Sequence, residues 1–145
     1  MTKYVYLAGP MEDKPQAEIN DWRTIARLAL GRASGHLITI TPARSEPETL
    51  YTPKASKEIF AKNLLDCKSC DLLLAYMPSF LTQDRGNYGT TMEVAWFAMM
   101  QKPIVLVSDN PKIINHPLFW HGCDWITDSL DDALDIVPRI LGPYE

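Results

Sequence analysis

The residues with the clearest chemical potential lie in the stretch 86–96, which reads GNYGTTMEVAW. Its glycines and threonines predict a loop that turns into a helix, with Thr90 as the N-cap. Thr90 and Glu93 then have the spacing of a capping box, in which both side chains bind free backbone N–H groups. A second interpretation makes Glu93 a nucleophile in the first helical turn, beside N–H groups that hold a sugar or phosphate. Such a carboxylate can form a covalent glycosyl intermediate.

Two residues near the end of the first predicted strand belong to the same candidate site. Tyr6 can reach across to orient the Glu93 carboxylate, or it can pack as a core aromatic with its hydroxyl at the rim. Gly9 allows a ligand to approach the backbone closely, or it forms a plain turn with Pro10. These two pairs of interpretations stay open on the residues alone.

The cysteines and histidines do not favour redox or metal chemistry. Cys67 and Cys70 have redox spacing, but they follow a predicted helix, whereas a redox pair usually precedes one. His116, His121 and Cys123 are too few for a structural zinc site, which needs four closely placed ligands. We therefore expect no metal and no cofactor, and an odd number of reduced, packed thiols.

Strands and helices alternate along the chain, and these elements must position the candidate residues. Strands are expected at residues 3–8, 37–41, 71–76, 103–107 and 124–127. The apolar runs among them are expected to be buried strands. Four helices are expected. The first is capped by Asp13 and has Pro15 in its first turn, and the next two span residues 54–67 and 91–101. The last is capped by Asp128 or Ser129 and runs through Leu141, and Pro138 inside it is expected to kink or shorten it. The first helix has an apolar face of Ala17, Ile19, Trp22, Ile25, Ala26, Leu28 and Ala29, and ends near Gly31 and Gly35.

This alternation predicts an α/β fold in which helices cover both faces of a parallel sheet. Five strands suit the flavodoxin-like order 2-1-3-4-5. Ligands of such folds bind beyond the carboxyl ends of the first and third strands, where the strand order reverses. The loops at that place are Gly9-Pro10-Met11 and residues 77–89, and the second leads to Glu93. Residues 42–53 are expected to form a lid or rim, and 108–122 an irregular segment with one helical turn.

Composition sets the broad class. The chain has 145 residues, 46% hydrophobic and 22% charged, which suits one domain over 1–145. A net charge of −4 argues against binding nucleic acid or an anionic membrane surface. The sequence shows neither a signal peptide nor a membrane span, so we expect a cytoplasmic protein. Four tryptophans and several methionines predict a homo-oligomer.

Several short motifs together resemble the nucleoside 2-deoxyribosyltransferase family. They are YLAGP at 6–10, DLLLA at 71–75, GTTMEVA at 89–95 and KPI at 102–104, in the order of the family. The resemblance covers residues 3–107, and Asn115-His116-Pro117 is similar to bacterial and phage-type members. It implies a homo-oligomer with shared active sites that acts on a small-molecule nucleoside or nucleotide and a free nucleobase.

The resemblance also implies roles for individual residues. Glu93 matches the glutamate that attacks the anomeric carbon, and Tyr6 matches the tyrosine that orients it. Gly9, in the loop with Pro10 and Met11, lies beside the sugar. Asn115 or His116 is expected to serve at the 5′ end of the sugar, where a neighbouring subunit closes the pocket.

Two positions depart from the family pattern. Asn63, eight residues before Asp71, stands at a position where many members have an aspartate. Asn63 and Asp71 are both expected to bind the substrate. An asparagine has no titratable proton to donate, so Asn63 does not fit the role of a general acid. Asp66 or Asp84 are possible substitutes. Asn87 stands where transferases often place an aspartate and related nucleotide N-hydrolases a serine, and an amide suits either role.

Three functions follow from these observations. The leading one is a nucleoside 2-deoxyribosyltransferase that works through a covalent glycosyl-Glu93 intermediate. The second is a nucleoside 5′-monophosphate N-glycosidase, in which Thr90, Thr91 and nearby N–H groups hold the phosphate. Gly89, just before them, is also an expected substrate-binding residue. The third is a non-catalytic nucleotide- or flavin-binding module, because a fold does not determine a function.

Overall fold

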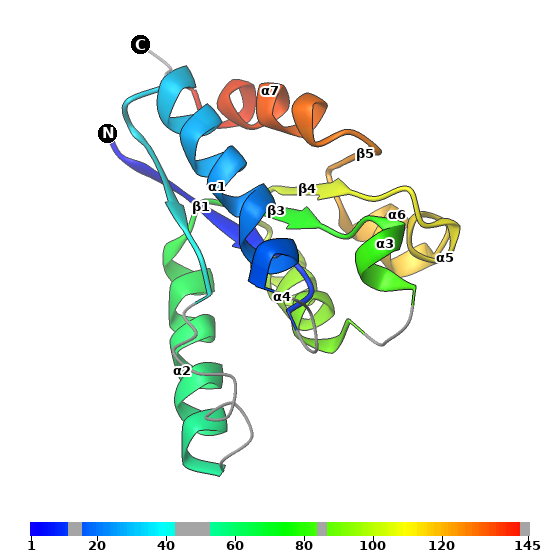
Figure 1. The fold of residues 1–145 in the computed structure, drawn as a ribbon. Coiled ribbons are helices and arrows are strands. Elements are labelled where there is room, and N and C mark those ends of the chain that lie inside the picture. Colours follow the sequence, from blue (N-terminus) through cyan, green and yellow to red (C-terminus); the bar gives the residue numbers. More distant parts are fainter. Residues whose placement is uncertain (12–15, 43–52, 84–86, 143–145) are drawn as a thin grey trace.

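The computed structural model describes residues 1–11, 16–42, 53–83 and 87–142, and it shows a five-stranded sheet between two layers of helices (Figure 1). The strands are β1 (Lys3–Ala8), β2 (Leu37–Ile40), β3 (Leu72–Tyr76), β4 (Ile104–Val107) and β5 (Trp125–Thr127). All neighbouring strands are parallel, in the order β2-β1-β3-β4-β5. The fold class and strand order predicted from the sequence are confirmed.

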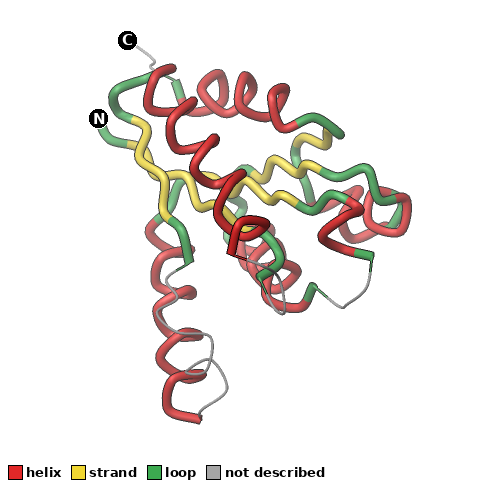
Figure 2. Tube along the Cα trace, viewed as in Figure 1, coloured by secondary structure: helices red, strands yellow, loops and turns green. Residues whose placement is uncertain are grey.

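Seven helices lie within the described residues. They are α1 (Gln16–Ala33), α2 (Pro53–Ser69), α3 (Ser79–Thr82), α4 (Tyr88–Met99), α5 (Pro111–Ile114), α6 (Pro117–Gly122) and α7 (Leu130–Leu141). Helices α1 and α7 lie over one face of the sheet, and α2 and α4 lie on the other (Figures 1 and 2). No helix among these described segments is long and apolar enough to cross a membrane.

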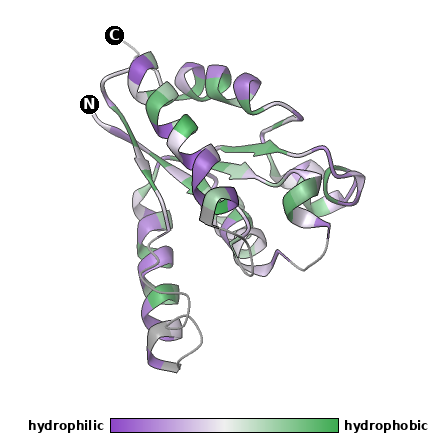
Figure 3. Ribbon diagram, in the orientation of Figure 1, coloured by the Kyte–Doolittle hydropathy of each residue, from purple (hydrophilic) through white to green (hydrophobic). Residues whose placement is uncertain are grey.

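The two faces of the sheet are built from alternate residues of the same strands. In β1, Val5 and Leu7 pack under α1 and α7, whereas Tyr6 and Ala8 pack under α2 and α4. This follows from the two-residue period of a strand, which sends successive side chains to opposite faces. Figure 3 shows hydrophobic colours along β3 and β4, two of the three inner strands of the sheet. Apolar runs of this kind therefore form strands that are buried on both faces.

Strand β2 is less buried than expected. It pairs on one side only, with β1, and Ile38 is 45% exposed. An edge strand has one neighbour and receives less cover from the helices, so the prediction of a fully buried second strand was wrong. It also ends at Ile40, one residue earlier than expected.

Helix α1 buries part of the predicted face: Ile19, Trp22 and Ala26 are buried as expected. Ile25 and Leu28 are exposed, whereas Leu30 and Arg23 are buried. The helix passes through Gly31 and ends at Ala33. Its expected cap, Asp13, lies outside the described residues.

The last helix largely agrees with its prediction. The Ser129 side chain accepts a hydrogen bond from the Asp132 N–H, as an N-cap does. Helix α7 ends at Leu141 as predicted, with Pro138 inside it. Pro138 therefore does not shorten the helix, and the alternative expectation, a kink, stays a prediction. Pro138 lies in the final turn, and its missing N–H removes one helical hydrogen bond, the one to the carbonyl four residues earlier.

Two connections contain more structure than expected. Residues 77–89 hold α3 and the start of α4, and 108–122 hold both α5 and α6. The expected lid at 42–53 lies almost entirely outside the described residues.

Candidate active site

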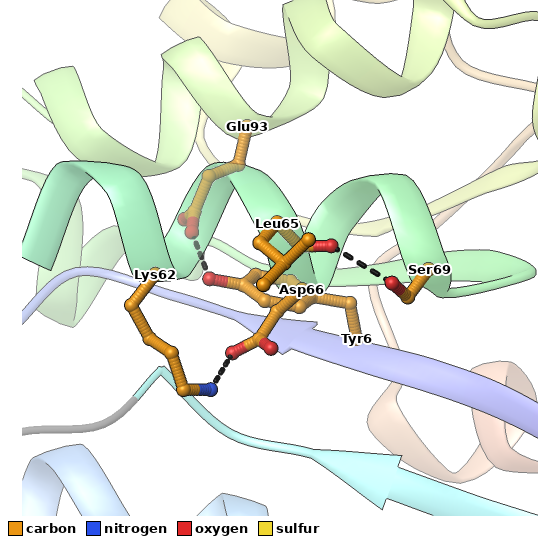
Figure 4. A network of polar contacts seen from close by, with 6 residues as sticks. All are labelled: Tyr6, Lys62, Leu65, Asp66, Ser69 and Glu93. Carbon is orange, nitrogen blue, oxygen red and sulfur yellow. Dashed lines mark hydrogen bonds and ion pairs between the residues drawn. The ribbon is translucent and has the colours of Figure 1, made fainter.

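The centre of the candidate site is a hydrogen bond between Tyr6 of β1 and Glu93 of α4. The Tyr6 hydroxyl donates to Oε2 of Glu93, and the two residues are 87 apart in the chain. Tyr6 is fully buried and Glu93 is 6% exposed. Figure 4 shows the Glu93 side chain pointing from its helix toward the Tyr6 hydroxyl. The structure thus brings together the two residues expected to be catalytic, while their catalytic roles remain predictions.

The start of α4 differs from the prediction. Its N-cap is Asn87, which makes no side-chain cap bond, and its first helical residue is Tyr88. Thr90 is therefore inside the helix, and Glu93 lies in the second turn. The predicted capping box was wrong because the Glu93 carboxylate faces the sheet and binds Tyr6 instead of the helix terminus. Its orientation depends on a tertiary contact.

Helix α2 forms the other wall of this buried cluster. Cys67, in its last turn, is fully buried and belongs to the same apolar cluster as Tyr6. Burial and the nearby Glu93 charge raise the pKa of Cys67 to about 12. Asn63 lies one turn earlier on the same side of the helix and is also buried. Its Oδ1 has no hydrogen-bond partner among the described residues.

The other expected acids are engaged elsewhere or not described. Asp66 forms an ion pair with Lys62, with 2.6 Å between Oδ2 and Nζ (Figure 4). Asp71 lies at the start of β3, at the opposite end of the strand from Tyr76, and its Oδ2 accepts a hydrogen bond from the Tyr4 N–H at 2.8 Å. The structure therefore does not bring Asp71 to the carboxyl edge of the sheet. Asp84 lies outside the described residues.

Gly9 follows β1 at the carboxyl edge of the sheet, where the protein leaves no room for a side chain. A Cβ at this position would lie 2.9 Å from Cζ2 of Trp22 and 3.1 Å from the carbonyl oxygen of Tyr76. Packing inside the protein is therefore sufficient to explain a glycine at this position, independently of any approach by a ligand. Pro10 is buried after it and Met11 is half-buried.

Arg23 holds this connection in place, which the sequence did not indicate. Arg23 is 3% exposed, and its guanidinium donates to the carbonyl oxygens of Leu7 and Gly9, at 3.4 Å and 3.2 Å. It also lies over the ring of Trp22, 4.7 Å from the centroid. The predicted apolar face of α1 included Trp22 but not its charged neighbour, because arginine is rarely buried.

Replacing Gly9 by alanine should lower the free energy of unfolding by about 1–3 kcal/mol, because Trp22 and the Tyr76 backbone must move. Urea denaturation followed by circular dichroism measures this difference. The matched control is Gly89→Ala in α4, where no described atom lies within 4 Å of the added Cβ and stability should be equal or higher. Equal loss in both variants would contradict the steric argument.

A polar network joins the β3–α4 connection to the β4–α5 connection. The Ser79 N–H donates to Asp109 Oδ1 at 2.7 Å, and Asn110 Nδ2 donates to the Thr82 hydroxyl at 2.9 Å. Thr82 in turn donates to the Pro78 carbonyl at 2.9 Å. The hydrogen bonds from Ser79 hold the pKa of Asp109 below its ordinary value. Sequence reasoning did not identify these residues, because the hydrogen-bonded partners on the two connections are about 30 positions apart. The one local signal was Asn110-Pro111, which has the pattern of a helix N-cap followed by proline.

Asn115 and His116 lie on the surface beyond β4. Asn115 is the C-cap of α5, and the Nδ1 of His116 accepts the Leu118 N–H as the N-cap of α6. Both are exposed. Within the described chain, no contact joins either residue to Glu93.

The cysteines form no disulfide. Burial raises the pKa of Cys67, Cys70 and Cys123 to about 12 in each case. A redox-active thiol needs a lowered pKa, because the thiolate is the nucleophile. The raised pKa values therefore give no sign of thiolate activation in the Cys67–Cys70 pair.

Comparison with known proteins gives the context of this geometry. The sequence profile described as nucleoside 2-deoxyribosyltransferase matches residues 5–131. This chain belongs to the nucleoside 2-deoxyribosyltransferase family. The match includes Tyr6, Gly9, Asn63 and Glu93. The family includes transferases and binds nucleosides and nucleobases as small molecules. A search of curated protein sequences gave no significant match.

Solved structures share the fold of this family member. A 2-deoxyribosyltransferase from Bacillus psychrosaccharolyticus has a TM-score of 0.69 at 18% identity, with 91% of this chain and 90% of that chain covered. A conserved protein from Enterococcus faecalis V583 has a TM-score of 0.69 at 16% identity, with 97% and 99% covered. A molybdenum cofactor binding protein from Rippkaea orientalis has a TM-score of 0.64 at 16% identity, with 98% of this chain and 99% of that chain covered. At these identities the likeness concerns the fold alone.

Proposed function

We propose that this family member transfers 2-deoxyribose between nucleobases by double displacement through Glu93. The observation that carries the proposal is the hydrogen bond from the Tyr6 hydroxyl to the Glu93 carboxylate. The pair lies between the sheet and α4, and the loop that leads into α4 starts at the carboxyl end of β3, where ligands of this fold bind. Glu93 provides the anionic nucleophile, and Tyr6 holds one of its oxygens.

In the first step, a carboxylate oxygen of Glu93 bonds to the anomeric carbon of the deoxyribose. The glycosidic C–N bond breaks, and its electron pair leaves with the nucleobase. In the second step, a nitrogen of another base attacks the same carbon and releases the carboxylate. Two inversions restore the original anomeric configuration. Water in place of the second base gives hydrolysis.

Asn63 is the proposed contact for the leaving base. Its buried Oδ1 has no protein partner within the described residues, so a donor on the ligand would satisfy it. An amide cannot supply a titratable proton, so the leaving base must take its proton from solvent or from another group. We therefore expect Asn63 to bind the base without acting as a general acid.

The remaining ligand contacts follow from position. Gly9, Pro10 and Met11 are proposed to line the sugar, and the start of α4 at 87–90, where Tyr88 and Gly89 are exposed and Thr90 is buried, is proposed to face its polar groups. Asn115 and His116 are proposed to serve the pocket of a neighbouring subunit. Asp71 is left out of the proposed binding set because its carboxylate already binds the Tyr4 N–H.

A chromatographic assay tests this function. The protein is incubated with 2′-deoxynucleosides and with their 5′-monophosphates, each with and without a second free base. A new nucleoside that forms only with the second base supports the transferase. Free base released from a monophosphate without exchange supports the N-glycosidase instead. No turnover of any substrate contradicts both reactions and favours a binding module.

We also propose that the protein is a homo-oligomer that associates through an apolar face on α2 and α4. This α2/α4 face consists of Phe60, Tyr88, Met92, Trp96 and Met99. The four from α4 lie on one side of the helix, and the Phe60 ring meets the Trp96 ring edge-on at 5.6 Å. Met99 is 86% exposed and Tyr88 is 76% exposed. A helix this apolar on its outer side normally packs against a partner.

Sedimentation velocity tests the interface. Met99→Asp places a charge on the α2/α4 face and should shift the protein toward the monomer. The matched control is Ile25→Asp on α1, which is 53% exposed on the other side of the sheet and should leave the oligomer intact. A wild-type monomer, or dissociation by the control alone, would contradict the proposed interface.

A further inference from the structure

The backbone of β1 alternates between its two neighbouring strands. The Lys3 N–H donates to the carbonyl oxygen of His36, which precedes β2. The Tyr4 carbonyl oxygen accepts the N–H of Asp71, which precedes β3. Because the backbone groups of successive residues in a strand point to opposite sides, odd-numbered residues of β1 face β2 and even-numbered residues face β3. The backbone groups of Tyr6 therefore face β3.

Strand β2 separates from β1 before β1 ends. The pairing between the two strands stops at Tyr6 and Ile40. The next odd-numbered residue, Leu7, directs its carbonyl oxygen to the place of residue 42 in the continued register. That residue is Pro42, which has no N–H to donate. Strand β2 therefore provides no donor for Leu7, and Gly9 lies further beyond the end of the pairing.

Arg23 of α1 supplies donors at this edge. Its guanidinium binds both carbonyl oxygens, with 3.4 Å from Nε to that of Leu7 and 3.2 Å from Nη2 to that of Gly9. Nη1 donates to the carbonyl oxygen of Ile19, one turn earlier in α1. The guanidinium carbon also lies 4.7 Å from the centroid of the Trp22 ring. A rigid group with several donors is thus fixed by its own helix and takes the place of a paired strand.

We propose that Arg23 is a positioning residue, which holds the connection at residues 9–11 in the conformation that binds the sugar. This inference rests on the proposed function, in which the same connection lines the sugar. A connection that is already ordered loses less conformational freedom when the substrate binds, which lowers the dissociation constant. The nucleophile should not be affected, because the Tyr6 side chain packs on the opposite face of the sheet from Trp22.

Steady-state kinetics with variants of Arg23 test the role. Arg23→Met keeps an unbranched side chain but removes its donors, and KM for the nucleoside should rise about tenfold, the lower end of what a hydrogen bond to a charged group contributes. The value of kcat should stay within about twofold, because the bound geometry is unchanged. Arg23→Lys can donate to one of the two carbonyls and should have an intermediate KM. A fall in kcat with unchanged KM would overturn the proposal.

The matched control is Arg27→Met, one turn further along α1. Arg27 has the same charge but is exposed, and this variant should keep the wild-type KM. An equal rise of KM in Arg23→Met and Arg27→Met would show that positive charge on α1, and not the hydrogen bonds of Arg23, is responsible. If circular dichroism shows that Arg23→Met does not fold, Arg23→Lys decides the question, and a wild-type KM in that variant would refute the role.

Two measurements without turnover separate this inference from the proposed function. Hydrogen exchange of the Gly9 and Met11 amides, followed by NMR in the free protein, should be at least about fivefold faster in Arg23→Met than in Arg27→Met. In a Glu93→Ala background, calorimetry should give a Kd for 2′-deoxynucleosides that is about tenfold higher when Arg23→Met is added.

The combined outcomes distinguish the two claims. Equal exchange rates, or equal Kd values, would overturn the positioning role even if the enzyme is active. A raised Kd in a protein whose wild type shows no turnover would support the positioning role while contradicting the transferase. A protein that binds no nucleoside would contradict both.

Discussion

Replacing Glu93 by alanine is expected to lower base exchange by at least about a thousandfold, because the reaction loses its nucleophile. The side chain is almost fully buried and is bound by the Tyr6 hydroxyl. A water molecule that enters the space cannot form the glycosyl intermediate. The measurement is the rate of new nucleoside formation, followed by chromatography under saturating substrate.

Two further variants show that the loss comes from the carboxylate. Glu93→Gln keeps the shape and can still accept the Tyr6 hydrogen bond, yet it should be nearly as inactive because an amide is a poor nucleophile. Asp66→Asn removes a nearby carboxylate that is paired with Lys62 on α2, and it should keep most of the activity. Near-normal exchange by Glu93→Ala, with a wild-type circular dichroism spectrum, would refute the assignment of the nucleophile.

The second large effect is expected from Tyr6→Phe. This variant removes only the hydroxyl, and the Glu93 carboxylate loses a buried donor. We expect kcat to fall about 10- to 100-fold, in line with about 1.5–3 kcal/mol for a hydrogen bond to a charged group. KM should change little, because the lost interaction orients the nucleophile and is not a contact with the substrate.

Steady-state kinetics over a range of nucleoside concentrations measures this separation of kcat from KM. The matched control is Tyr76→Phe, because Tyr76 ends β3 at the same edge of the sheet. Its ring packs against Trp22 on the other face of the sheet, with 4.8 Å between the ring centroids. That variant should keep kcat close to the wild-type value. A large rise in KM with unchanged kcat in Tyr6→Phe would assign Tyr6 to substrate binding instead.

The fold was readable from the sequence because its strands and helices are coded locally. Apolar runs such as YVYLA and LLLAY predicted strands buried on both faces, and only a parallel sheet with two helical layers provides such an environment. Boundaries were less accurate where a tertiary contact overrides a local signal. Ile38 is apolar but exposed, because its strand lies at the edge of the sheet.

The sequence by itself determined the fold class, the strand order and the segment that carries Glu93, since hydrophobic periodicity and turn residues act over short distances. Only the tertiary structure decided what the side chains of that segment do. Glu93 has the spacing of a capping residue, yet its carboxylate meets a tyrosine 87 positions away. Arg23 acquires its role from the carbonyl groups of Leu7, in β1, and Gly9, which follows it. A buried polar group takes whichever partner packing brings to it, and no local pattern records that partner.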